Sequence, residues 1–187
     1  MIMDVTQLVA QCRTGDRLAV ERLVQKFQPM MYRLAISILD DTREAEEATQ
    51  DALFAALQAI NSYRGEAVFT TWLYAITLNL CRNRLRARQR RSRVYALFQG
   101  LRHLKEESAI EPEERVIQRE TSSLIYQTVQ SLDEKHRLPV ILRYYHDCSI
   151  DEISQILDIP PGTVHSRLNK ARQKLKHRLS ESHRYSK

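Results

Sequence analysis

The sequence is poor in the residues that interrupt helices. Its 187 residues include only four glycines and five prolines, and so few turn-forming residues favour a mostly helical chain. The glycines occur singly, so no glycine-rich phosphate-binding loop can be formed from them. This absence argues against a helicase or kinase driven by nucleotide hydrolysis, and the composition predicts an all-α fold.

Cysteine is scarce as well, and no long apolar run is present. Cys12, Cys81 and Cys148 are odd in number and unpaired in spacing, which suits a reducing cytosol better than a disulfide framework or a zinc ribbon. His146 and Cys148 form an isolated H-x-C pair without a second pair of ligands, so we expect no metal site and no cofactor. Because neither a signal peptide nor a membrane-spanning run occurs, we expect a cytoplasmic protein without membrane insertion.

The formal net charge of +6 conceals an alternation along the chain. Residues 1–60 carry a net charge of −3, residues 61–105 of +9, residues 106–160 of −7 and residues 161–187 of +7. Two basic blocks suggest two separate contacts with nucleic acid, and the acidic blocks suit a basic protein partner.

The first 60 residues predict three helices with buried apolar faces. The first covers about residues 4–12, the second begins after Asp16 and is bent or restarted by Pro29, and the third covers about residues 43–60. The first two turns of the third helix are acidic and carry Glu44, Glu46, Glu47, Gln50 and Asp51. Such a face is either solvated, with a favourable helix-dipole interaction, or docks to a basic partner. The number of these groups exceeds what capping needs and favours docking.

Residues 63–93 combine aromatic and basic side chains. The four aromatic residues are Tyr63, Phe69, Trp72 and Tyr74, and they precede seven arginines between residues 82 and 93. A helix is expected from about residue 69 to residue 91. Aromatic faces accept unstacked bases, and guanidinium groups bind phosphates. The alternative is a core helix with buried aromatics and a merely solvated arginine end. The residues expected to face inward are Trp72, Leu73, Ile76, Leu80 and Leu85.

A linker and a second helical unit follow. Apolar periodicity is lost over residues 94–118, which predicts a flexible linker. Further on, Ser149 and Glu152 have capping-box spacing at the start of one helix, and Pro160-Pro161-Gly162 separates that helix from another that is basic on its outer side. Two short helices joined by a brief turn predict a helix-turn-helix, with a generic helical hairpin as the alternative.

Three motifs in order resemble those of bacterial extracytoplasmic-function (ECF) sigma factors, the two-domain specificity subunits of RNA polymerase. They lie at residues 44–51, at residues 62–65 with 69–74 and Asn79, and at residues 162–168 with 171–172. The resemblance covers nearly the whole sequence. It implies a region 2 domain at residues 1–93, a linker at 94–118, a region 4 helix-turn-helix domain at 119–182 and a tail at 183–187.

The resemblance also implies roles for individual residues. Core polymerase would bind Glu44, Glu47, Gln50, Asp51 and Phe54. The minus-10 element would be read and melted by Tyr63, Arg64, Phe69, Trp72, Asn79, Arg82, Asn83 and Arg86. The minus-35 duplex would be gripped by Thr163, His165, Ser166, Arg167, Asn169, Lys170, Arg172 and Lys174. The sequence departs from the family at Asn83, which is often acidic, and at His165 and Lys170, which affects the promoter sequence rather than the role.

The implied mechanism is binding without catalysis. A base flipped from the non-template strand would lie between the loop at residues 63–68 and Asn79. Melting then needs no ATP, because stacking in a pocket returns roughly 1–3 kcal/mol per base against an unstacking cost of about a few kcal/mol. The expected partners are core RNA polymerase and promoter DNA, with an anti-sigma factor as a further candidate because many members of the family have one.

Two other functions are weaker interpretations. A dimeric helix-turn-helix repressor or activator would leave the acidic first domain and the aromatic cluster around Trp72 without a use. An enzyme acting on nucleic acid would need a metal-ligand cluster or an acid–base pair at suitable spacing, and the sequence contains neither.

Overall fold

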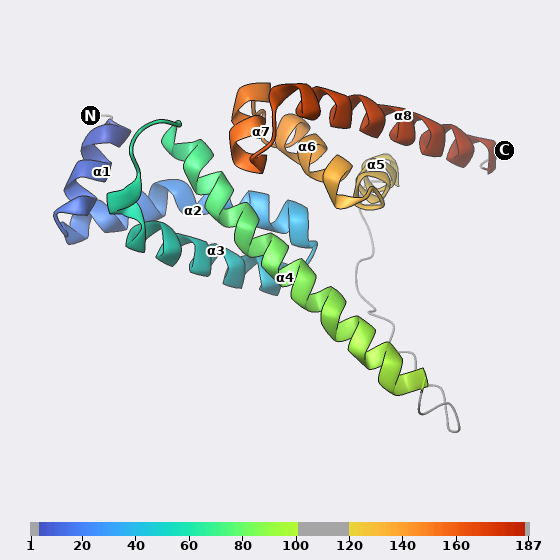
Figure 1. Cartoon of the computed structure of the whole chain (residues 1–187), viewed down its shortest axis with the longest axis horizontal. Helices are drawn as coiled ribbons and strands as arrows, with labels where there is room; N and C mark the ends of the chain where they lie inside the picture. The colour runs from blue at the N-terminus through green and yellow to red at the C-terminus, as the bar shows by residue number, and fades with distance from the viewer. Residues whose placement is uncertain (1–3, 101–119, 186–187) are drawn as a thin grey trace.

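The computed structural model describes residues 4–100 and 120–185, and every regular element in these two ranges is helical (Figure 1). The elements are α1 (Val5–Arg13), α2 (Arg17–Leu39), α3 (Thr42–Gln58), the short 3-10 helix η1 (Ile60–Ser62), α4 (Phe69–Gly100), α5 (Glu120–Gln130), α6 (Glu134–Tyr144), α7 (Ile150–Leu157) and α8 (Pro161–Tyr185). The predicted all-α fold is confirmed. Within the described ranges, no helix is both long and apolar enough to cross a membrane.

Polar residues fix the positions at which the helices begin. The side chains of Asp4, Asp16 and Asp41 accept hydrogen bonds from backbone N–H groups in the first turns of α1, α2 and α3. Ser149 and Glu152 form the predicted capping box of α7: Ser149 Oγ accepts from Glu152 N at 3.2 Å, and Glu152 Oε2 accepts from Ser149 N at 2.7 Å. These bonds satisfy N–H groups that have no partner within the helix, so local sequence determines these boundaries.

Two helices are longer than the sequence predicted. Helix α2 continues through Pro29, which is exposed and neither ends nor restarts it, because the flanking residues Phe27 and Met31 remain buried in one core. Helix α4 continues to Gly100 instead of ending near Arg91. Residues 92–99 contain neither glycine nor proline, so losing the apolar pattern does not end the helix. Residues 94–100 therefore belong to α4, while residues 101–118 of the predicted linker lie outside the described ranges.

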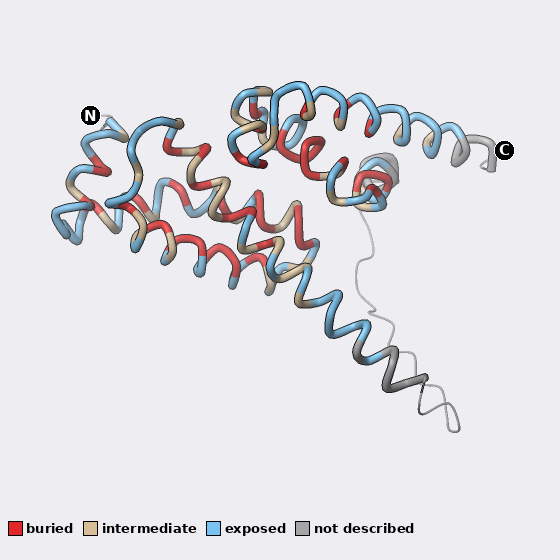
Figure 2. Tube along the Cα trace, in the orientation of Figure 1, coloured by how far each residue is buried: buried red, intermediate tan, exposed pale blue. Residues whose placement is uncertain are grey.

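The first half of the molecule, α1 to α4, encloses an apolar core. Helices α2 and α3 lie side by side, and α4 crosses both of them (Figures 1 and 2). The inner face of α3 is built from small residues, since Ala45, Ala48, Ala52 and Ala56 are all buried. Small side chains allow close approach of the helices. This packing turns the acidic face of α3 outward.

The second half, α5 to α8, contains the predicted helix-turn-helix. Asp158 closes α7 in the left-handed conformation, with φ at 52°, and the backbone then passes Pro160 into α8. Helices α7 and α8 pack on one another and on α6. Val164, Leu168 and Ala171 bury one face of α8, which leaves its opposite face exposed.

The two halves also pack against each other. Helix α4 contacts α7 and helix α2 contacts α6, and one apolar cluster contains residues of both halves. Leu78 and Cys81 of α4 belong to this shared cluster and have no exposed surface. Helix α4 is therefore buried on two sides over its first part, while its later part is exposed (Figure 2). We call this packing of α1–α4 against α5–α8 the closed arrangement.

Candidate protein- and DNA-binding surfaces

The predicted docking residues share one outer face of α3. Glu47, Gln50 and Asp51 are exposed, Phe54 is 65% exposed and Glu44 is half-buried. The spacing of three and four residues places these side chains on one side of a helix. The result is an acidic strip that ends in an exposed aromatic ring, a combination that suits a partner with basic and apolar side chains.

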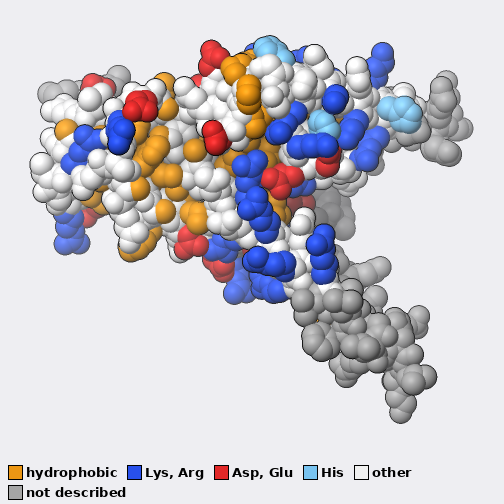
Figure 3. All heavy atoms as spheres, viewed as in Figure 1, with side chains coloured by type: hydrophobic (Ala, Val, Ile, Leu, Met, Phe, Trp, Pro, Cys, Tyr) orange, Lys and Arg blue, Asp and Glu red, His pale blue; other side chains and the backbone are white. Residues whose placement is uncertain are grey.

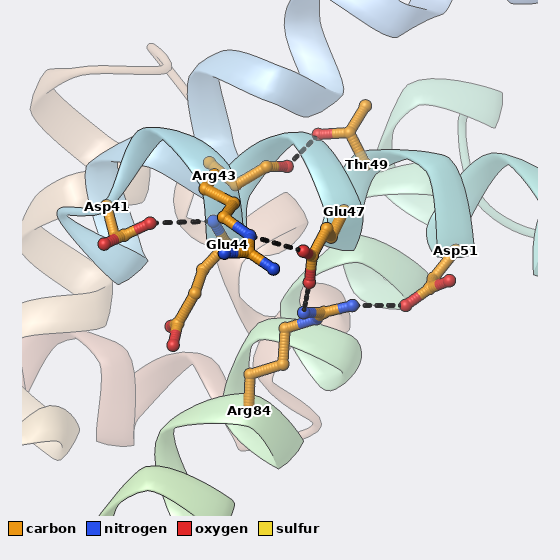
Figure 4. Close-up of polar contacts among 8 residues, drawn as sticks. Asp41, Arg43, Glu44, Glu47, Thr49, Asp51 and Arg84 are labelled. Carbon is orange, nitrogen blue, oxygen red and sulfur yellow. Dashed lines mark hydrogen bonds and ion pairs between the residues drawn. The ribbon is translucent and has the colours of Figure 1, made fainter.

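Arg84 of α4 binds two of the carboxylates on this strip (Figure 4). One terminal nitrogen lies 2.9 Å from Glu47 Oε2 and the other lies 2.5 Å from Asp51 Oδ2. Arg43 donates to the remaining oxygen of Glu47 at 3.2 Å. These hydrogen bonds, with that from Arg84 the strongest, hold the pKa of Glu47 below its usual range. The sequence grouped Arg84 with the phosphate-binding arginines, whereas the structure places it on the docking carboxylates.

Glu44 differs from its acidic neighbours. Its backbone N–H donates to Asp41 Oδ1 at 2.8 Å, which is one half of a capping box. The other half is not formed, because the buried Glu44 Oε2 accepts no hydrogen bond from the described residues. Glu44 is thus part of the helix start more than of the exposed strip.

The aromatic cluster is packed rather than splayed out. Phe69 is 3% exposed and meets Phe27 edge-on, with ring centroids 5.2 Å apart. Tyr63 and Trp72 are half-buried, and Tyr63 lies 5.1 Å from Phe69 and 5.3 Å from Trp72. The ring of Phe69 is therefore not available to stack on a base in this conformation. The interpretation that these aromatics form part of a core applies to Phe69, while Tyr63 and Trp72 keep exposed surface.

The loop at residues 63–68 is held from both sides. The Tyr63 hydroxyl donates to the Ala67 carbonyl at 2.7 Å across the loop. Arg13 of α1 donates to the carbonyl of Ile60 at 3.2 Å and to that of Tyr63. Between α1 and the loop lies an open groove of about 950 Å³. The contribution of Arg13 could not be predicted from the sequence, since nothing in a lone arginine at the end of a short helix indicates a contact 47 residues away.

The predicted minus-10 residues on α4 and in the loop before it differ in their surroundings. Asn79, Asn83 and Arg86 of α4 and Arg64 of the loop are exposed, as predicted for DNA contacts. Arg82 is instead half-buried, and its Nε lies 2.8 Å from Glu134 Oε1 of α6. Lysine and arginine side chains gather along the outer part of α4 and over the second half of the molecule (Figure 3).

The outer face of α8 carries the predicted minus-35 residues. His165, Ser166, Asn169 and Lys170 are exposed, and Thr163 and Arg167 are half-buried. Two further members of the set have partners in the chain. Arg172 lies 2.9 Å from the Tyr144 hydroxyl and 3.2 Å from Asn169 Oδ1, and Lys174 Nζ lies 3.0 Å from Asp133 Oδ1.

Comparison with known proteins identifies the family. Residues 23–91 match the family model for sigma-70 region 2, and residues 122–175 match that for sigma-70 region 4. The chain is 32% identical to the ECF RNA polymerase sigma factor SigW of Bacillus subtilis, over 97% of this chain and 100% of that one. The chain belongs to the ECF RNA polymerase sigma factors. This sigma factor is also 35% identical over 174 residues to the RNA polymerase sigma-H factor of Pseudomonas aeruginosa, with 89% of each chain covered.

A solved structure shares the fold of this sigma factor. It is the complex of the sigma factor RpoE with the anti-sigma factor NepR from Bartonella quintana, which matches with a TM-score of 0.64 and 24% identity. The match covers 86% of this chain and 96% of the RpoE chain. The family models and the curated relatives, rather than this structure, show that the sigma factor acts in transcription initiation, with region 2 in the first half of the molecule and region 4 in the second.

Proposed function

We propose that this sigma factor binds core RNA polymerase, the minus-10 element and the minus-35 element through three separate surfaces. The strip on α3 with Glu47, Gln50, Asp51 and Phe54 docks on core RNA polymerase. The loop at residues 63–68 and the exposed side of α4 read and melt the minus-10 element, and the outer face of α8 grips the minus-35 element as duplex. The observation that carries this proposal is that each predicted set has exposed members on an element of its own.

Melting at the minus-10 element is proposed to rest on capture of a flipped base. The groove beside the loop offers space for such a base, and Asn79, exposed further along α4, offers an amide for hydrogen bonding. Arg64 and Arg86 are exposed and suit contacts with the adjacent backbone. Phe69 supports the loop from the core instead of touching DNA. Binding energy alone drives this step, so the protein acts without catalytic chemistry of its own, in the cytoplasm where polymerase is found.

An anti-sigma factor is a further proposed partner. The support is that the solved structure of similar fold holds the sigma factor RpoE in complex with the anti-sigma factor NepR. The family membership of this chain makes the same class of partner the first to search for.

Charge reversal on α3 tests the docking surface. We expect Glu47→Lys combined with Asp51→Lys to abolish measurable binding to core polymerase, because the exposed strip would repel a basic partner. The control is Glu21→Lys, which reverses an exposed acid on α2 that lies 3.4 Å from Arg17 of the same helix. Circular dichroism checks that both variants stay helical. Equal polymerase affinity of the double variant and the control would refute the docking assignment.

A further inference from the structure

Two adjacent carboxylates at the start of α6 each bind a cation of a proposed DNA-binding surface. Glu134 binds Arg82 of α4 across the two halves of the molecule, at 2.8 Å. Asp133 binds Lys174 of α8 within the second half, at 3.0 Å. Arg82 belongs to the proposed minus-10 surface and Lys174 to the proposed minus-35 surface. The two adjacent carboxylates thus bind one cation from each of the two proposed DNA-binding surfaces.

These contacts compete with DNA by their chemistry. Guanidinium and ammonium groups donate to carboxylate oxygens and to phosphate oxygens with the same geometry. The Arg82 side chain is 21% exposed and that of Glu134 is 38% exposed, so this pair is less screened by salt than one at the open surface. A phosphate that accepts from Arg82 Nε must therefore displace Glu134.

Other contacts hold the same two halves together. The Tyr126 hydroxyl donates to Asp40 Oδ1 at 2.9 Å, and Gln130 Nε2 donates to the Ser37 carbonyl at 2.9 Å. Beneath them lies the apolar cluster shared by α2, α4 and the second half. The closed arrangement is thus a packed interface, in which the Arg82–Glu134 pair is the contact that uses a DNA-binding cation.

The closed arrangement is also too short to span a promoter. Minus-10 and minus-35 elements are centred about 25 base pairs apart, or about 85 Å at 3.4 Å per base pair. In the structure α4 packs directly on α7, and only the eight residues of α7, about 12 Å of helix, precede the turn into α8. Both elements can be bound at once only if the halves separate.

We propose that Asp133 and Glu134 act as internal mimics of DNA phosphate. Asp133 occupies Lys174 within the second half, and Glu134 occupies Arg82 across the two halves. The Glu134 pair favours the closed arrangement and keeps Arg82 of the free sigma factor off DNA until the two halves separate. The inference rests on the proposed function, because it takes Arg82 and Lys174 as DNA contacts. The competing ligand is the phosphate backbone of duplex DNA, of any sequence.

The test compares two isosteric substitutions that change the net charge equally. Glu134→Gln removes the cross-domain ion pair, and Glu21→Gln removes an exposed pair within α2. We expect Glu134→Gln to increase the radius of gyration in small-angle scattering. We also expect it to raise the affinity of the free protein for a short fluorescent duplex by about two- to fivefold, the range that corresponds to losing one partly exposed ion pair. The salt dependence should steepen by about one unit, since Arg82 gains a phosphate.

A charge swap separates the ion pair from local effects on α6. Glu134→Arg alone and Arg82→Glu alone should both expand the molecule, and the double variant should restore the compact radius. Circular dichroism confirms that each variant is folded. The proposal is overturned if Glu134→Gln binds duplex no better than Glu21→Gln, or if the double variant stays as expanded as the single ones. Failure of wild-type protein to support transcription with core polymerase would instead refute the proposed function, because the scattering and duplex measurements use no polymerase.

Discussion

Arg84 links the docking strip on α3 to the helix that carries the DNA-binding arginines. In sequence it is one of seven arginines in a row of similar spacing. In space its guanidinium lies between Glu47 and Asp51, and its side chain is only 26% exposed. Neighbouring Arg86 is exposed. We infer that Arg84 positions the docking carboxylates and does not contact phosphate.

Replacing Arg84 by alanine should weaken docking on core polymerase. Without the guanidinium, Glu47 and Asp51 repel each other at four-residue spacing and lose their fixed orientation, so binding must order them again. We expect a loss of about two- to fivefold in titrations with core polymerase, in the range of one partly exposed ion pair, and partial recovery with Arg84→Lys. Arg86→Ala should leave docking unchanged and lower the salt slope for duplex binding by about one unit. Tighter docking of Arg84→Ala would show that Arg84 competes with polymerase.

Asn79 is the residue that tests base capture. It is exposed on α4, nine residues beyond Thr70, the last residue that lines the groove between α1 and the loop. With core polymerase, Asn79→Ala should leave closed-complex binding nearly intact, because α8 and the arginines still hold duplex, and should reduce promoter opening. Permanganate reactivity of unpaired thymines, on a linear template at matched occupancy, measures this. Gln25→Ala, an exposed amide on α2, is the control. Reactivity equal to that of the control would contradict capture by Asn79.

At the scale of elements, the sequence predicted those features that depend on contacts between residues close together in the chain. The start of α2 after Asp16, the capping box of Ser149 and the turn before α8 all follow from contacts within a few residues, and the structure contains each of them. The exposed acidic strip of α3 followed from helical spacing in the same way. These features fix the fold class and the three candidate surfaces.

Contacts between distant elements were not predictable from the same patterns. The inward face expected on α4 included Leu73 and Leu80 but not Leu78 or Cys81, which are fully buried. A helix buried on two sides has no single apolar stripe, so a search for one face finds only half of the core. The partners of Arg13 and Arg84 were missed for a related reason, since sequence shows a charge but not what lies opposite to it.

We expect α8 to contain two kinds of DNA contact: contacts to base edges, which depend on the sequence, and contacts to phosphates, which do not. His165 and Asn169 are exposed on its outer face, and replacing either with alanine should change the preference among upstream sequences by about 1–3 kcal/mol per affected base pair. Lys176 is exposed two turns further on, and Lys176→Ala should weaken binding to all sequences alike and reduce the salt slope. Binding of a randomised duplex pool measures both effects. A uniform loss of affinity in the His165 and Asn169 variants would contradict base reading.

At the scale of the whole molecule, His146 connects the two halves through neutral hydrogen bonds. Its Nε2 lies 3.3 Å from Ser37 Oγ of α2, and its Nδ1 lies 3.4 Å from the Tyr74 hydroxyl of α4. The Ser37 hydroxyl already donates to the Leu34 carbonyl at 2.8 Å, so Nε2–H donates to Ser37 and Nδ1 accepts from Tyr74. Burial raises the pKa of Tyr74, which keeps its hydroxyl protonated as the donor. The neutral imidazole thus makes a hydrogen bond to each of two helices of the first half, α2 and α4.

Mild acid should therefore loosen the closed arrangement. Burial first, and the positive charge of Arg33 second, lower the pKa of His146 from 6.5 to about 4, and Asp147 opposes this shift only in part. A depressed histidine pKa means that the closed state excludes the proton. Its stabilisation is complete above pH 6.5 and declines as pH falls from 6.5 towards 4. We expect the radius of gyration of the wild-type protein to increase between pH 7 and pH 5 while helix content stays constant. His146→Gln, which does not titrate, should remove this increase, and His165→Gln on the exposed face of α8 should preserve it. An acid response that persists in His146→Gln would assign the response to another group.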